Sequence, residues 1–459
     1  MFLEIVRSSG LAHLSYILGD AGKAAVVDPR RDHDIYLEIA AREGCLITHV
    51  FETHRNEDYV VGSTGLAAAT GAEVYHGKQM DFAYGTGVTE GDSFEVGSLA
   101  LSVLHTPGHT EESISIALYD RGFSAEELVA VFTGDALFIG DVGRTDFFPG
   151  REEEMAGLLY DSIFGKLLPM GDSVILFPGH GQGSICGGNL APREFSTLGF
   201  ERRHNPALRH AAKEDFITAK TAERLFMPGY FERVHTLNQQ GPPLLPALPA
   251  PLPLDPASFE DLAGGGTVLD VRSKEAFAGA HLPGSLSIAL DKVSSYAGWY
   301  LDYGKPVFLV ANTAGEVAAA VRYLVRLGFD DIPAYLAGGM FKWEVSGRPF
   351  GRMKAVHAEE LVAMLDAGED FTLLDVRAPG EFEDAHLPTA VNVHMGELPC
   401  RLEEVPRDAK VVTFCGSGER ATIAASILLK NGYENTQACF GSMAACSNLG
   451  CPIETGVDR

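Results

Sequence analysis

THRNEDY, residues 53–59, is the stretch that decides how the N-terminal part of this chain is built. A turn that binds two metal ions would read H-x-H-x-D-H, with four ligating side chains on one short loop. His54 and Asp58 stand in that pattern, but Asn56 and Tyr59 occupy the other two imidazole positions. The stretch therefore supplies fewer ligands than a two-metal site of this kind needs.

Two further motifs downstream carry metal-ligating residues. TPGHT, residues 106–110, contains His109, and TGDA, residues 133–136, contains Asp135. Two imidazoles and one carboxylate leave about three positions open around a single ion, and this ligand set is typical of non-haem Fe(II). The sequence therefore predicts one Fe(II) per chain, with His54, His109 and Asp135 as its ligands.

Composition limits the broad class of protein. A chain of 459 residues should form roughly two to four domains. Its formal net charge of −26 argues against nucleic acid or an anionic membrane as the main partner. MFLEIVR, residues 1–7, does not read as a secretion signal, and no apolar run is long enough to span a bilayer. Seven irregularly spaced cysteines without a C-x-x-C pair favour reduced thiols and a cytoplasmic location.

The chain divides at a segment rich in Pro and Leu, residues 239–255, which is typical of a stiff linker. Residues 1–238, before it, alternate short apolar strands with glycine-rich turns, and the His and Asp motifs follow such strands. After it, LDVR and AHLP, beginning at residues 269 and 280, recur at residues 374 and 385, a shift of 105 in each case (374 − 269 and 385 − 280). This repeat predicts two tandem domains, residues 256–352 and 353–459, in which strands alternate with helices around a parallel sheet.

The two repeats differ at one loop. The second repeat has CGSGER, residues 415–420, between a strand and a helix, whereas the first has Ala311 in place of the thiol. Backbone N–H groups of Gly416, Ser417, Gly418 and Glu419, together with the start of the helix, would stabilise an anion there. Arg420 adds a positive charge, so we expect Cys415 to be a nucleophile that carries sulfur as a persulfide.

This Cys-x-x-Gly-x-Arg loop, with the Asp-Val-Arg and His-Leu-Pro elements, resembles the rhodanese family of sulfurtransferases over residues 256–456 or so. The resemblance implies that Cys415 carries the persulfide and that Arg420 is the loop arginine. It also implies that the first repeat is a catalytically silent rhodanese-like domain with a role in packing or docking.

The N-terminal motifs resemble the metallo-β-lactamase fold. GDA at residues 134–136 followed by GRTD at residues 143–146 is similar, more narrowly, to the persulfide dioxygenase branch. The resemblance implies an αββα sandwich followed by two rhodanese-like α/β domains, the layout of bacterial multidomain persulfide dioxygenase–sulfurtransferases. It further implies His54, His109 and Asp135 as iron ligands and Arg144 as a substrate-binding residue.

Three further polar residues lie near these motifs and are not expected to bind the metal. Asp58 and His180, the latter within PGHG at residues 178–181, are expected to lie outside the ligand set. Cys186 follows in a glycine-rich loop, where it is either an accessory thiol that faces the substrate or a structural residue.

The expected function is coupled sulfur oxidation. A low-molecular-weight thiol persulfide and O2 give sulfite, and Cys415 passes sulfane sulfur to sulfite to form thiosulfate, or runs the reverse step, in sulfide detoxification. The expected partners are these small molecules, without nucleic acid or membrane, and a homo-oligomer is left open. Two alternatives are a glyoxalase II-like metal-dependent thiolesterase and a non-catalytic protein that binds or senses sulfane sulfur.

Overall fold

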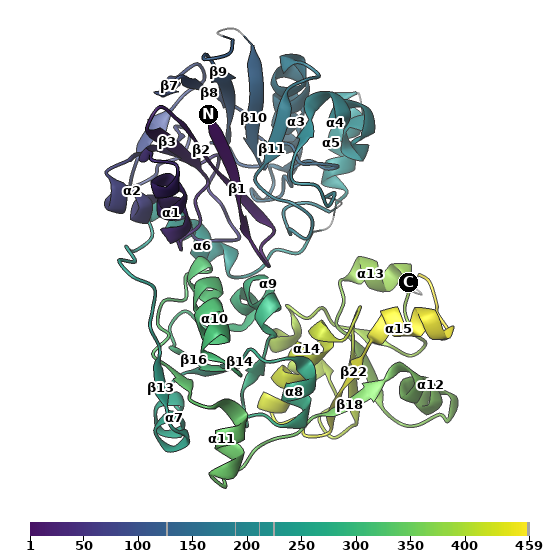
Figure 1. Ribbon diagram of the computed structural model, residues 1–459. Coiled ribbons are helices and arrows are strands. Elements are labelled where there is room, and N and C mark those ends of the chain that lie inside the picture. Colours follow the sequence, from purple (N-terminus) through teal and green to yellow (C-terminus); the bar gives the residue numbers. More distant parts are fainter. Residues whose placement is uncertain (125–126, 189, 211, 224, 457–459) are drawn as a thin grey trace. The chain divides into compact units, whose positions relative to one another are not determined.

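The computed structural model describes residues 1–124, 127–188, 190–210, 212–223 and 225–456 (Figure 1). The chain forms two compact units. The first contains Met1–Leu248 together with Val325–Gly328, and the second contains Pro249–Leu324 and Phe329–Arg459. Among the described residues, no helix combines the length and the apolar character needed to cross a bilayer.

The first unit is built on two sheets of six strands each. In spatial order the first sheet contains β1 (Phe2–Ser8), β2 (His13–Asp20), β3 (Lys23–Val27), β4 (Leu46–Phe51), β5 (Glu73–Gly77) and β6 (Thr86–Val88). The second contains β12 (Ser196–Thr197), β11 (Ile175–Pro178), β10 (Leu128–Gly134), β9 (Ile114–Asp120), β8 (Leu99–His105) and β7 (Ser93–Val96). Each sheet mixes parallel and antiparallel pairs.

The two sheets pack face to face because their strands are apolar on both faces. In β3, Ala25 and Val27 belong to the core between the sheets, whereas Ala24 and Val26 belong to a second core on the outer face. Alternate residues of a strand point to opposite faces, so a strand that is apolar throughout must be covered on both sides. Helices supply the outer covers.

The described residues of this unit form six α-helices: α1 (Asp34–Arg42), α2 (Ser63–Thr70), α3 (Glu152–Ser162), α4 (Leu198–His204), α5 (Lys213–Thr221) and α6 (Phe231–Gln240). Tyr36 and Leu66, from α1 and α2, pack on the outer face of the first sheet. Leu159 and Phe216, from α3 and α5, pack against strands of the second sheet (Figure 1). The four layers confirm the predicted αββα sandwich.

The second unit contains two parallel sheets of five strands. In spatial order the first has β13 (Leu252–Leu254), β17 (Ala334–Leu336), β16 (Val307–Val310), β14 (Thr267–Asp270) and β15 (Leu286–Ser287). The second has β18 (Lys354–His357), β22 (Thr436–Phe440), β21 (Val411–Phe414), β19 (Thr372–Asp375) and β20 (Val391–Asn392). Both sheets follow the same order, which confirms tandem α/β domains with parallel sheets.

The helices of this unit lie between those strands in the sequence, except for α15, which follows the last one. Around the first sheet they are α7 (Pro256–Ala263), α8 (Lys274–Gly279), α9 (Val293–Tyr300), α10 (Ala314–Arg326) and α11 (Gly339–Val345). Around the second they are α12 (Ala358–Asp366), α13 (Pro379–Asp384), α14 (Glu419–Lys430) and α15 (Ser442–Leu449).

The segment expected to be a linker, residues 239–255, is only partly a connector. Its last part forms β13, which pairs in parallel with β17, and its first two residues end α6. Proline lacks a backbone N–H and is tolerated on an edge strand, so Pro253 does not prevent the pairing. The linker predicted from composition is therefore too long at both ends, because it includes the end of α6 and the strand β13.

Candidate metal centre and sulfur-transfer loop

The metal motifs of the first unit all follow the ends of strands, one in the first sheet and two in the second. His54 follows β4, His109 follows β8 and Asp135 follows β10. Gly134 makes this convergence possible, because its backbone has φ +51° and an added Cβ would lie 2.4 Å from Thr53 Oγ1. Loops at strand ends thus bring together residues that are far apart in the sequence.

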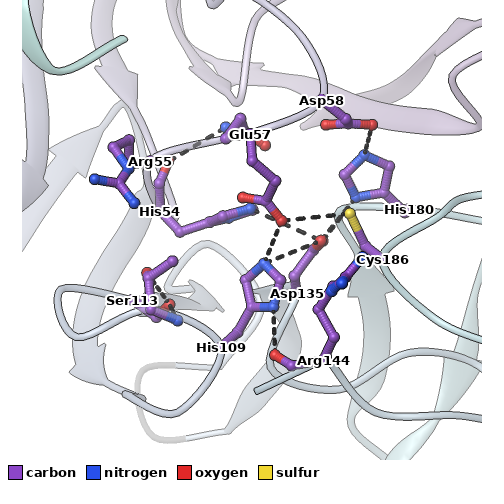
Figure 2. A network of polar contacts seen from close by, with 12 residues as sticks. His54, Arg55, Glu57, Asp58, His109, Ser113, Asp135, Arg144, His180 and Cys186 are labelled. Atoms are coloured by element: carbon purple, nitrogen blue, oxygen red, sulfur yellow. Dashed lines mark hydrogen bonds and ion pairs between the residues drawn. The ribbon is translucent and has the colours of Figure 1, made fainter. Parts of the chain in front are cut away.

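Four buried side chains meet at this place (Figure 2). The ligand-type atoms of His54, Glu57, His109 and Asp135 all lie within 4.8 Å of one another. Asp135 Oδ2 is 3.8 Å from His54 Nε2 and 3.6 Å from His109 Nε2. The structure therefore brings the three predicted ligands together and adds Glu57, which sequence reasoning missed.

Both imidazoles are oriented with one nitrogen free. His54 Nδ1 donates to Thr53 Oγ1 at 2.9 Å, and His109 Nδ1 donates to the Arg144 carbonyl oxygen at 3.0 Å. Among the described residues neither Nε2 atom has a hydrogen-bond partner, although both histidines are buried. A ligating histidine normally donates its other N–H in this way, so the donor set fits a metal ion.

The protonation states of His54 and Asp135 also suit metal binding, which requires neutral imidazole and ionised carboxylate. For His109, burial lowers the pKa, but the nearby Glu57 carboxylate outweighs burial and raises it. Burial lowers the pKa of His54 to about 3. Burial alone would raise the pKa of Asp135, but the nearby His180 and His54 hold it below its usual value. The site therefore has a neutral imidazole and a carboxylate anion ready to bind a cation.

His180 lies beside this cluster and contacts two carboxylates. Its Nδ1 donates to Asp135 Oδ1 at 2.8 Å and its Nε2 donates to Asp58 Oδ2 at 3.0 Å. Burial lowers the pKa of His180, but these two carboxylates outweigh burial and raise it well above the usual value. His180 therefore orients Asp135, and Asp58 orients His180.

Cys186 is also buried at this site. Its thiol donates to Glu57 Oε1 at 3.4 Å, and Cys186, Asp58 and His180 form a second group of ligand-type atoms (Figure 2). Burial, followed by the charges of Glu57 and Asp58, raises the pKa of Cys186 well above its usual value. The thiol is therefore a protonated hydrogen-bond donor, and its predicted contact with substrate stays a prediction.

Arg144 is buried, and each of its three guanidinium nitrogens donates a hydrogen bond. Nε and Nη2 donate to the two carboxylate oxygens of Asp146 at 2.6 and 2.7 Å, and Nη1 donates to the Ile185 and Phe226 carbonyls. The observed link to the metal site is the Arg144 carbonyl, which accepts from His109. Its role in binding substrate stays a prediction.

A chain of hydrogen bonds supports His54 from behind. Thr53 Oγ1 donates to Asp28 Oδ2 at 2.7 Å, and the Thr53 backbone N–H donates to Asp28 Oδ1 at 2.7 Å. Sequence reasoning missed Thr53 and Asp28, because their signals in the sequence are weak. Thr53 directly precedes His54, and Asp28 directly follows β3. Glu57 stood inside the motif, at a position to which the pattern assigns no ligand.

Replacing Thr53 by Val should weaken metal binding about 10- to 100-fold, the usual effect of removing an outer hydrogen-bond partner of a ligand. Valine keeps the shape of threonine but cannot accept the N–H of His54. Anaerobic competition for Fe(II) with a chromophoric chelator measures the affinity. Thr48→Val is the matched control, because Thr48 lies in β4 and its hydroxyl donates to the Ala24 carbonyl of β3. Equal affinities in both variants would contradict the orienting role of Thr53.

The predicted sulfur-transfer loop lies in the second unit, between β21 and α14. Cys415 is buried, and the Gly418 N–H donates to its Sγ at 3.1 Å. Gly418 has φ +101°, and an added Cβ would lie within about 3.3 Å of three backbone atoms of residues 439–441. The loop thus turns a backbone N–H toward the sulfur at the start of a helix, which stabilises a sulfur anion.

The other loop residues have different contacts. Arg420 donates to both carboxylate oxygens of Glu381 at 2.6 and 2.8 Å. Gly416 lies beside the Arg420 guanidinium, Ser417 is exposed, and Glu419 pairs with Lys274. Arg420 is therefore held near the loop by Glu381, another residue that the sequence did not indicate.

The first repeat packs directly against the second. Lys274 in α8 pairs with Glu419, and the Tyr300 hydroxyl at the end of α9 donates to the Met395 carbonyl at 3.0 Å. The Trp299 and His394 rings lie edge to face with centroids 5.6 Å apart. Through these contacts the first rhodanese-like repeat packs against the second.

Comparisons with known proteins match both units. The family model for the metallo-beta-lactamase superfamily matches residues 9–180, and the model for the rhodanese-like domain matches residues 255–346 and 357–448. The persulfide dioxygenase ETHE1 of Mus musculus is 30% identical over 226 residues, which cover 47% of this chain and 77% of that protein. The hydroxyacylglutathione hydrolase GloC of Haemophilus influenzae is 29% identical over 231 residues and is covered over 98% of its length.

Two further matches extend this result. An uncharacterized protein of Mycobacterium leprae is 38% identical over 119 residues, but this chain spans only 44% of its length. A crystal structure of a metallo-beta-lactamase from Staphylococcus aureus is 32% identical, with a TM-score of 0.66, and covers 73% of this chain and 98% of its own. The chain therefore belongs to the metallo-β-lactamase superfamily, in the persulfide dioxygenase branch, joined here to two rhodanese-like domains.

Proposed function

We propose that the protein oxidises a low-molecular-weight thiol persulfide with O2 and transfers sulfane sulfur at Cys415. The observation that supports this most is the buried cluster in which two free imidazole nitrogens and the Asp135 carboxylate meet. Similarity to the ETHE1 persulfide dioxygenase supports the same chemistry. The oxidation would follow RSSH + O2 + H2O → RSH + SO3²⁻ + 2H⁺.

His54, His109 and Asp135 would hold one Fe(II), which would supply the redox chemistry for oxidation of the persulfide sulfur by O2. The chain's own residues hold the reactants together and exclude bulk water. His180 keeps the Asp135 carboxylate oriented, and Thr53 keeps His54 in the tautomer with a free Nε2. The Phe147 ring lies edge-on to His109 with centroids 5.1 Å apart and forms an apolar wall.

The sulfur-transfer step uses Cys415. Its thiolate attacks the outer sulfur of a persulfide. The S–S bond of RSSH breaks, the outer sulfur becomes bound to Cys415 Sγ, and RSH is released. Sulfite then attacks that sulfur, giving thiosulfate and the free thiol of Cys415, for a net reaction RSSH + SO3²⁻ → RSH + S2O3²⁻. The Gly418 N–H stabilises the sulfur anion that forms at each stage. The reverse reaction would instead make persulfide for the metal site, and both directions serve sulfide detoxification.

The wild-type protein should consume O2 when offered glutathione persulfide and form about one sulfite per O2, recovered as the sum of sulfite and thiosulfate, as the balanced equations require. An oxygen electrode and analysis of sulfite and thiosulfate measure these quantities, and metal analysis of anaerobically purified protein should give one iron per chain. Stoichiometric zinc without iron, together with no uptake of O2, would refute the proposal. Such a result would favour a protein that only binds or senses sulfane sulfur.

A thiolesterase is the second candidate, because the GloC relative is named a hydroxyacylglutathione hydrolase. A second ion would need Asp58, His180 and Cys186, but both His180 nitrogens are already hydrogen-bonded to carboxylates. Hydrolysis of an acyl-glutathione thioester, with two metal ions per chain, would select this function over oxidation.

A further inference from the structure

The loop between β4 and α2 places Glu57 inside the metal cluster. Its carboxylate points toward the free nitrogens and not toward solvent, and the residue is fully buried (Figure 2). Glu57 Oε1 lies 2.9 Å from His109 Nε2. Its Oε2 has no hydrogen-bond partner among the described residues. Within the described part of the chain, Glu57 Oε2 thus has no hydrogen-bond donor, in the same cluster in which the Nε2 atoms of His54 and His109 have no hydrogen-bond partner.

A buried carboxylate needs compensation for the hydration that it loses. Among the described residues, the Glu57 carboxylate contacts the His109 nitrogen and the thiol of Cys186, which is a weak donor. His109 Nδ1 already holds its proton in the hydrogen bond to Arg144, so Nε2 is a free lone pair when the ring is neutral. A cation between Glu57 and His109 would satisfy both atoms.

The spacing of the four groups suits one ion. Donors that each lie about 2.1 Å from the same ion are roughly 3–4 Å apart. The distances from His109 Nε2 are 2.9 Å to Glu57 Oε1 and 3.6 Å to Asp135 Oδ2, and His54 Nε2 is 3.8 Å from Asp135 Oδ2. All three distances fall near or within that range.

We propose that Glu57 is a fourth protein ligand of the metal, so that the site is formed by two histidines and two carboxylates. Two carboxylates neutralise the charge of a divalent ion, and about two positions instead of three stay open for reactants. Cys186 is then a positioning residue, because its thiol donates to the Glu57 oxygen that faces His109. The inference rests on the metal site of the proposed function and not on the sulfur compound that is oxidised.

The test compares wild type with Glu57→Gln and Glu57→Ala in metal binding alone. Fe(II) affinity is measured by anaerobic chelator competition, and the visible spectrum of the Co(II)-substituted protein reports the number of ligands. We expect both variants to bind Fe(II) at least about 10- to 100-fold more weakly and to show a changed Co(II) spectrum. Glu112→Gln is the matched control, since that buried carboxylate accepts from the Arg55 N–H and Thr110 hydroxyl and lies outside the cluster.

Thermal unfolding separates ligation from a structural role. Without metal, Glu57→Gln should unfold at a midpoint equal to or above that of wild type, because a buried charge is removed. With metal, its midpoint should rise less than that of wild type. Unchanged affinity and an unchanged Co(II) spectrum in Glu57→Gln would overturn the proposal, and this variant suffices if Glu57→Ala does not fold. Neither measurement uses persulfide or O2, so failure of the proposed reaction would leave this result standing.

Discussion

We expect replacement of His109 by Ala to lower persulfide-dependent O2 consumption by more than about 100-fold. Removing an outer partner of a metal ligand already costs 10- to 100-fold, so removing the ligand itself should cost more. His109 Nε2 faces both Asp135 and Glu57, and alanine leaves this side of the cluster without a nitrogen donor. An oxygen electrode and sulfite analysis measure the loss, and iron content shows whether it arises from metal binding.

The matched control for this variant is His105→Ala. His105 ends β8 only four residues earlier, and its ring contacts the Glu111 carbonyl outside the metal cluster. It should keep most of the O2 consumption. The His109 variant should also retain sulfur transfer at Cys415, because that loop belongs to the other unit. Normal persulfide oxidation by His109→Ala would refute the metal assignment.

Replacement of Cys415 by Ser should lower sulfur transfer between thiosulfate and an acceptor by at least about 1,000-fold, as loss of a nucleophile does in other enzymes. Serine is similar in size, so the loop and the Gly418 N–H should persist, but its hydroxyl cannot hold a transferable sulfane sulfur. Rhodanese activity is measured by transfer of sulfur from thiosulfate to cyanide. Mass spectrometry should find the added sulfur on wild type and not on the variant.

The products of persulfide oxidation provide a second measurement for Cys415→Ser. With glutathione persulfide and O2, Cys415→Ser should consume oxygen at the wild-type rate but accumulate sulfite in place of thiosulfate. Cys400→Ser replaces an exposed thiol and should leave both activities unchanged. Transfer activity that survives in Cys415→Ser would place the sulfur carrier at another cysteine.

The fold could be predicted from the sequence where a local pattern repeats. The recurrence of LDVR at residues 269 and 374 indicated two tandem domains, and both sheets share one strand order. Strands that are apolar on both faces required helices outside the sandwich. The limits of the linker could not be predicted, because β13 is stabilised by its pairing with β17, which is some 80 residues away (334 − 252 = 82).

At the metal centre the sequence by itself determined which residue types were available and that His54, His109 and Asp135 lie in ligand motifs. At the sulfur-transfer loop it determined that Cys415 precedes a glycine-rich turn and a helix, since such a loop is formed by adjacent residues. The tertiary structure alone decided that Glu57 joins the cluster, that His180 bridges Asp58 and Asp135, and that Glu381 holds Arg420. The physical reason is that these contacts join loops from separate strands. Sequence spacing sets the direction of a side chain within an element, but it does not determine which distant side chain that element meets.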